Sequence, residues 1–218
     1  MMEIPTGLPP ELVPLSWLIG VWEGEGMVEY AIDGETRMHP FRQRVEFRHD
    51  DLPHLEYRSQ VWLLPDADDA DAATDADDAE PVAVPLSGEV GYWRLARERD
   101  AGDVGPGLLP PTQDSSMPNA DAVETLRNSD GGFDLEVSIA HPTGVIELYY
   151  GMIRGPRVDL ATDGVLRAKG AEDYRSATRL YGLVQNRLFW AWDIAALDQE
   201  LATHASAQLD RVDPAESN

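Results

Sequence analysis

The 218-residue chain contains no cysteine and few positive charges. Without cysteine it can form no disulfide, no iron–sulfur cluster and no cysteine-ligated zinc site, and it has no thiolate nucleophile. It has 17 Lys and Arg against 40 Asp and Glu, a formal net charge of −23. Because nucleic acid binding depends on clustered cations, this balance argues against a nucleic acid partner. Any redox chemistry therefore requires a bound cofactor or the Met, Trp and Tyr side chains.

Long apolar runs and targeting signals are also missing from the sequence. No run of about 18 apolar residues is present, so we predict no transmembrane helix and no membrane partner. Residues 1–10 lack the basic stretch and the apolar core of a secretory signal. Together with the absence of cysteine, this predicts a cytoplasmic protein.

Two stretches of biased composition interrupt the chain. Between Pro65 and Pro81 the sequence DADDADAATDADDAE carries eight acidic residues and no aromatic or branched apolar side chain. This composition predicts a disordered insertion over about 65–81. A second stretch, about 98–132, is dense in Pro, Gly, Ser and Asn, and we expect it to hold no regular element. Both are interpreted as loop insertions in one domain that spans residues 1–218.

Strand patterns dominate the rest of the chain. In 133–139 apolar and polar residues alternate strictly, which indicates a strand with one buried and one exposed face. The segment 12–19 is predicted to be the only helix, because Pro14 suits its first turn and Gly20 its C-terminal end. The other predicted strands are 21–30, 41–49, 55–62, 90–95, 145–152, 158–160, 179–184 and 188–194.

Many short strands with almost no helix predict an all-β fold, either a sandwich or a barrel. Roughly eight to ten antiparallel strands can close around one small ligand, as lipocalin-type barrels do. The predicted inward faces are rich in aromatic side chains, which favours a pocket for a flat apolar ligand. An ordinary packed core explains the same pattern more simply, so periodicity leaves both alternatives open.

Four segments, in order, carry motifs of a known family. The first reads GVWEGEG from Gly20 to Gly26 and contains the pattern Gly-x-Trp-x-Gly-x-Gly. The others are Gly91-Tyr-Trp-Arg94, Ala140-His-Pro-Thr-Gly144 and the closing stretch 200–212. Together they resemble the nitrobindin family, and the resemblance covers nearly everything from about 12 to 212 except the two insertions.

This resemblance implies one antiparallel β-barrel of about ten strands, similar to lipocalins and fatty-acid-binding proteins, with a short N-terminal helix. It also implies a ferric heme b whose iron is bound axially by His204, the match to the family's ligating histidine. A neutral imidazole is a strong axial donor and leaves the opposite face of the iron open for a small ligand. The glycines are assigned to the fold, and Trp22 is expected to close one end of the barrel.

Two positions depart from the family's pattern. Thr36 is the best match to the heme-contacting threonine of the family, within a segment, 31–40, that is longer here. Ser87, beside Leu86, stands where some members carry a histidine over the free face of the iron. The resemblance therefore implies that the free face of the iron has less basic surroundings here and stays open to small ligands.

The four remaining histidines are weaker ligand candidates. His49 and His54 flank a turn and are expected to be exposed. His39 lies in the lengthened segment, and His141, beside Pro142, is interpreted as structural. The sequence contains no HExxH motif, no Gly-x-Ser-x-Gly elbow and no phosphate-binding loop, which argues against zinc hydrolases, serine hydrolases and nucleotide-binding enzymes.

By resemblance, the function is a heme-dependent peroxynitrite isomerase, with His204 as its catalytic residue, that converts peroxynitrite to nitrate and also binds nitric oxide. One alternative is a metal-free β-barrel carrier of a fatty acid or another small apolar ligand, because a fold does not dictate a function. Another is heme storage or nitric oxide sensing without turnover. The expected partners are small molecules, and a homodimer is compatible with the sequence.

Overall fold

The computed structural model describes residues 7–32, 35–65, 83–196 and 201–212. The predicted acidic insertion therefore lies almost entirely outside the described residues. The ten strands are β1 (Gly20–Ile32), β2 (Glu35–Arg48), β3 (Leu55–Leu63), β4 (Val84–Leu95), β5 (Phe133–Ala140), β6 (Val145–Ile153), β7 (Arg157–Arg167), β8 (Tyr174–Val184), β9 (Arg187–Ala196) and β10 (Ala202–Val212).

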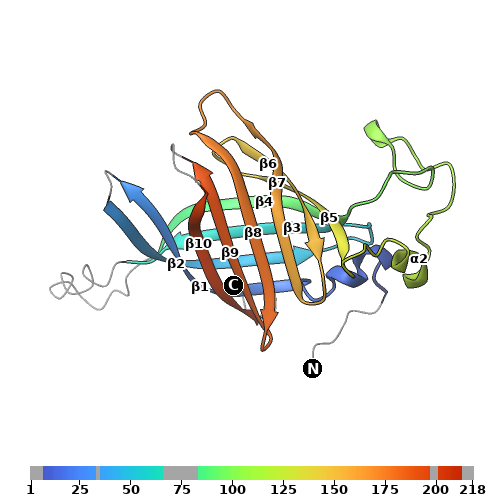
Figure 1. Ribbon diagram of the computed structural model, residues 1–218, viewed down its shortest axis with the longest axis horizontal. Coiled ribbons are helices and arrows are strands. Elements are labelled where there is room, and N and C mark those ends of the chain that lie inside the picture. Colours follow the sequence, from blue (N-terminus) through green and yellow to red (C-terminus); the bar gives the residue numbers. More distant parts are fainter. Residues whose placement is uncertain (1–6, 33–34, 66–82, 197–200, 213–218) are drawn as a thin grey trace.

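These strands form one closed barrel in which each strand pairs with its neighbour in the sequence (Figure 1). β10 pairs back onto β1, from Val21 opposite Val212 to Val28 opposite Ala205, so that the sheet has no free edge. The predicted all-β barrel is confirmed. In the described part of the chain, no helix is long and apolar enough to cross a membrane.

Each predicted strand overlaps an observed strand, but several strands are longer than predicted. β2 begins at Glu35, not near residue 41, because its first residues continue the ladder with β1 although their side chains are exposed. Side-chain alternation marks only the half-buried part of a strand, whereas backbone pairing continues past it. The β1–β2 hairpin consequently projects beyond the rest of the barrel (Figure 1).

The N-terminal helix is a 3-10 helix, η1 (Pro10–Leu15), and it ends earlier than predicted. Pro14 lies inside it and has no N–H for an α-helical hydrogen bond. The backbone uses i to i+3 hydrogen bonds instead, such as Leu12 N–H to the oxygen of Pro9 at 2.9 Å. This narrower helix suits a proline-rich segment that packs against one end of the barrel.

The prediction that 98–132 holds no regular element is wrong, and so is the prediction of a single helix. This stretch contains η3 (Pro106–Leu108) and a short α-helix, α2 (Ala120–Glu124). The Asn119 side chain caps α2 by accepting from the N–H of Ala122 at 2.9 Å. Val123 is buried and anchors α2 near η1. Tertiary burial of one apolar side chain thus stabilises a helix too short to be predicted from composition.

An aromatic core fills the part of the lumen nearest η1. Trp93 contacts Phe47 and Tyr181 edge to face, with ring centroids 5.3 and 5.1 Å apart. Trp22 is 1% exposed and its Nε1 donates to the backbone oxygen of Leu18 at 2.8 Å. A Cβ on Gly24, next along β1, would lie 2.2 Å from a backbone oxygen of β10, so only glycine allows the two strands to approach.

Candidate functional site

The other end of the lumen holds a cavity of about 250 Å³ that is partly open to solvent. The packed core and the ligand pocket that the sequence left as alternatives therefore both occur, at different levels of one barrel. Side chains from β1, β2, β3, β4, β6, β8, β9 and β10 line the cavity. Its apolar wall includes Phe41, Val61, Leu86, Trp190 and Trp192, and its polar wall includes Ser87, Glu89, His141, Tyr174 and His204.

His204 lines the cavity because of a bulge in β10. The register between β10 and β9 shifts between Thr203 and Ala205, so that His204 and Ala205 together face Trp192. In a regular strand, His204 would point away from the interior, where Ala205 is buried. A bulge re-aims a side chain, and both consecutive residues line the cavity here.

The surroundings of His204 select one form of its imidazole. Its Nδ1 lies 3.0 Å from the backbone oxygen of Glu29 on β1. A carbonyl oxygen only accepts, so the proton of the neutral ring is on Nδ1, and Nε2 keeps a free lone pair. Burial lowers the pKa of His204, which the hydrogen bond to Glu29 only partly offsets. A neutral imidazole held at its second nitrogen is the form that ligates a metal.

The donor set fits a heme better than a bare metal ion. Among the residues that the structure describes, no group of three or more His, Asp or Glu side chains could hold a metal ion. A heme supplies its own ring nitrogens and requires only an axial ligand from the protein. One imidazole beside aromatic and apolar walls therefore matches this cofactor.

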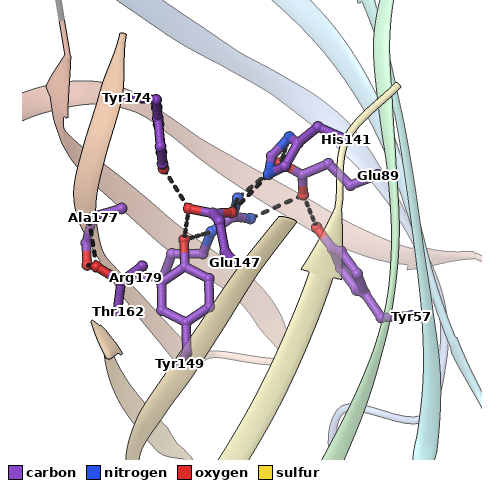
Figure 2. Close-up of polar contacts among 9 residues, drawn as sticks. All are labelled: Tyr57, Glu89, His141, Glu147, Tyr149, Thr162, Tyr174, Ala177 and Arg179. Atoms are coloured by element: carbon purple, nitrogen blue, oxygen red, sulfur yellow. Dashed lines mark hydrogen bonds and ion pairs between the residues drawn. The ribbon is translucent and has the colours of Figure 1, made fainter. Parts of the chain in front are cut away.

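A buried ionic cluster lies beside the cavity (Figure 2). Arg179 of β8 donates to both carboxylate oxygens of Glu89 on β4, at 2.9 and 2.8 Å, and lies 3.4 Å from Glu147 on β6. Tyr57 donates to Glu89 at 2.7 Å. Burial by itself raises the pKa of Glu89, but Arg179 outweighs it and lowers this pKa to about 2. Glu89 therefore stays ionised although it is buried.

Glu147 is the second carboxylate of the cluster. Tyr149 and Tyr174 both donate to its Oε1, the former at 2.5 Å, and burial raises the pKa of both phenols. Burial opposes ionisation of Glu147, but His141 and Arg179 lower its pKa overall. Since the ionised carboxylate only accepts, His141 donates to it from Nε2 at 2.6 Å. In the neutral ring the lone pair of His141 is then on Nδ1, which lies 3.6 Å from Oε1 of Glu89 inside the cluster.

This cluster was not predicted from the sequence, although two strands carry a signal for it. Glu147 lies between buried Val145 and Tyr149, on the apolar phase of β6. Arg179 similarly lies between buried Ala177 and Tyr181 on β8. A charged residue on the buried phase of a strand requires a partner of opposite charge inside the barrel.

Thr36 and the three remaining histidines are not among the described residues that line the cavity. Thr36 is exposed on the projecting part of β2 and is absent from the described residues that line the cavity, so its heme contact stays a prediction. His39 is half-buried and stacks on Tyr30, with ring centroids 5.6 Å apart. The expected exposure of His49 and His54 is wrong. Both are half-buried: the N–H of Asp51 donates to Nδ1 of His49 at 3.3 Å, and His54 contacts Tyr92 edge to face.

Comparison with known protein families shows to which family the chain belongs. The model of the THAP4-like, heme-binding beta-barrel domain matches residues 11–211. The chain belongs to this family. The family expected from the four sequence motifs is confirmed, and its heme-binding character agrees with the donor set around His204.

Curated relatives match almost the whole chain. It is 55% identical to the peroxynitrite isomerase of Clavibacter michiganensis subsp. michiganensis, over 98% of this chain and 100% of the relative. The proteins of the same name from Leifsonia xyli subsp. xyli and Kocuria rhizophila are 54% and 53% identical, over 98% of this chain and 100% and 97% of theirs. The crystal structure of Rv2717c from M. tuberculosis is 24% identical, with a TM-score of 0.62 over 94% of this chain and 99% of that one, and shows the same fold.

Glu89 is expected to make stability depend on acid pH. Its pKa falls on folding, from 4.5 to about 2, so its contribution is complete above pH 4.5 and is lost as the pH falls towards 2. As the pH falls through this range, the difference in unfolding free energy between the wild type and Glu89→Gln should therefore shrink by about 3 kcal/mol. Urea unfolding at a series of pH values measures this. Glu136→Gln, at an exposed ion pair with Arg94, is the control, and a constant gap for Glu89→Gln would contradict the prediction.

Proposed function

We propose that the protein is a ferric heme b protein that isomerises peroxynitrite to nitrate and binds nitric oxide. The observation that carries this proposal is His204, a neutral imidazole aimed into an aromatic cavity by a bulge. Membership of a heme-binding family supports the cofactor. Relatives named peroxynitrite isomerase, 53 to 55% identical over nearly the full length, support the substrate.

In this proposal, His204 holds the cofactor through Nε2 while the carbonyl of Glu29 holds its Nδ1–H. A ferric heme held there would supply a Lewis-acidic iron for the peroxynitrite anion. Phe41, Val61 and Leu86 give the cavity an apolar wall, which would limit the contact of reactive species with water. Ser87 lines the same cavity without adding a base.

The ionic cluster argues against a carrier of fatty acids. A carboxylate head group inside a barrel requires a free cation, but Arg179 is already paired with two carboxylates. Glu89 itself lines the cavity and would repel such a head group. An uncharged apolar ligand remains an alternative, and lipid extraction of the purified protein followed by mass spectrometry tests it.

Hemin titration and stopped-flow kinetics test the proposal. We expect hemin to give a saturable Soret band distinct from that of free hemin. The loaded protein should then accelerate peroxynitrite decay and raise the yield of nitrate, whereas the heme-free protein should do neither. A spectrum identical to that of free hemin would refute the heme assignment. Normal heme binding without faster decay would leave heme storage or nitric oxide sensing as the function.

Four further expectations remain predictions: the contact of Thr36 with the heme, the cytoplasmic location, the homodimer and the assignment of residues 1–218 to one domain. The absence of a membrane-spanning helix in the described part of the chain is compatible with the location. Thr36 lies on the β1–β2 hairpin. The same hairpin carries Glu29, whose backbone oxygen holds the His204 imidazole.

A further inference from the structure

Trp192 of β9 lies between the ionic cluster and His204. The guanidinium carbon of Arg179 is 4.3 Å from the centre of the indole, within the range of a cation–π contact. His141 stacks on the same side chain, with centroids 5.9 Å apart and planes 13° apart. His204 meets it edge to face, at 5.4 Å and 81°. One side chain thus contacts the cluster and the predicted axial ligand.

The backbone pairing explains this arrangement. Trp192 pairs with Arg179 on β8 and with Ala205 on β10, so the three strands place these residues in one cross-strand row. Because of the bulge, Trp192 is the single residue of β9 that faces both His204 and Ala205. The indole ring of Trp192 therefore lies beside the imidazole that the bulge turns into the cavity.

Ring contacts, and not a hydrogen bond, hold Trp192 in place. Its buried Nε1 has no hydrogen-bond partner among the described residues. Trp22 and Trp190 differ, because their Nε1 atoms donate to Leu18 and Gln43, both within 2.8 Å. The orientation of Trp192 therefore depends on the side chains packed against it, above all on Arg179, which two carboxylates immobilise.

We infer that Trp192 is a positioning residue that sets the plane of the His204 imidazole for axial ligation. This inference rests on the proposed heme function. The hydrogen bond to Glu29 restrains the ring at Nδ1 only, so the ring can still tilt about that contact. The edge-to-face contact with Trp192 supplies a second, independent restraint on the tilt of the ring. Ligating histidines commonly need such support for affinity and orientation.

Trp192→Leu tests the inference, with Trp190→Leu as the matched control. Trp190 lies two residues away on the same face of β9, but its ring packs on Phe41 and Tyr181. We expect Trp192→Leu to shift or broaden the iron–histidine stretching band in resonance Raman spectra of the reduced heme complex. Hemin should leave this variant roughly tenfold faster or more. Trp190→Leu should keep the wild-type band, and Trp192→Phe, which retains an aromatic face, should restore part of the loss.

Two outcomes would overturn the inference: a wild-type iron–histidine band in Trp192→Leu, or an equal shift in Trp190→Leu. Nuclear magnetic resonance of the heme-free protein separates this from a failure of the proposed function. The nuclear Overhauser signals between the His204 ring protons and neighbouring strands report the orientation of the ring directly, and they should change in Trp192→Leu and stay in Trp190→Leu whether or not the wild type binds heme. If the wild type binds no heme, the proposed function fails, while these signals still show whether Trp192 orients the ring.

Discussion

Replacing His204 with glycine is expected to abolish the Soret band of the heme complex and to reduce peroxynitrite isomerisation to the level of free hemin. The substitution removes the axial donor that the bulge aims into the cavity. His141, the other histidine in the cavity wall, is not expected to replace it, because its Nε2 donates to Glu147 and its Nδ1 lies 3.6 Å from the Glu89 carboxylate. Hemin titration of the variant, followed by absorption spectroscopy, measures the loss.

Added imidazole provides a rescue for His204→Gly. Glycine leaves space beside Trp192 for a free imidazole, which should restore the wild-type spectrum at high concentration. His54→Gly is the control, since His54 packs on Tyr92 and is absent from the described cavity lining, and its spectrum should stay that of the wild type. If His204→Gly bound heme normally and His141→Ala did not, the ligand assignment would have to move to His141.

Replacing Arg179 with methionine is expected to lower the free energy of unfolding by about 3–5 kcal/mol, because two buried carboxylates lose their cation. Glu89 and Glu147 cannot reach water easily, since their side chains are 12% and 0% exposed. Arg94→Met is the control. It breaks a pair with Glu136 in which Arg94 is 51% exposed, so its cost should stay below about 1 kcal/mol. Urea unfolding of the heme-free protein compares the two variants.

Neutralising both carboxylates should recover much of this loss. In the triple variant Arg179→Met, Glu89→Gln, Glu147→Gln, no buried charge is left without a partner, and the amides can still accept from the tyrosines. A triple variant that is no more stable than Arg179→Met would show that the packing of the guanidinium, and not its charge, stabilises the cluster. A loss near that of Arg94→Met would contradict the electrostatic account.

The prediction of the fold depended on local patterns. Alternation in 133–139 identified β5 within one residue of its observed end, because such a pattern requires only neighbours in the sequence. The choice between sandwich and barrel required the resemblance, since period two is the same in both. α2 was missed for a related reason, as its five residues are held by the burial of Val123 near η1, more than a hundred residues earlier in the chain.

The same distinction applies to the site. The sequence by itself determined the strand pattern, the aromatic inward faces and, through the resemblance, His204 as the ligand candidate. Alternation alone would have turned this side chain away from the lumen, and only the bulge opposite Trp192 reversed that. The carbonyl that holds its imidazole is 175 residues away, and Glu89 and Arg179 are 90 apart. Local periodicity reports which face of a strand is buried, whereas register and closure, which bring such partners together, depend on pairing across the whole chain.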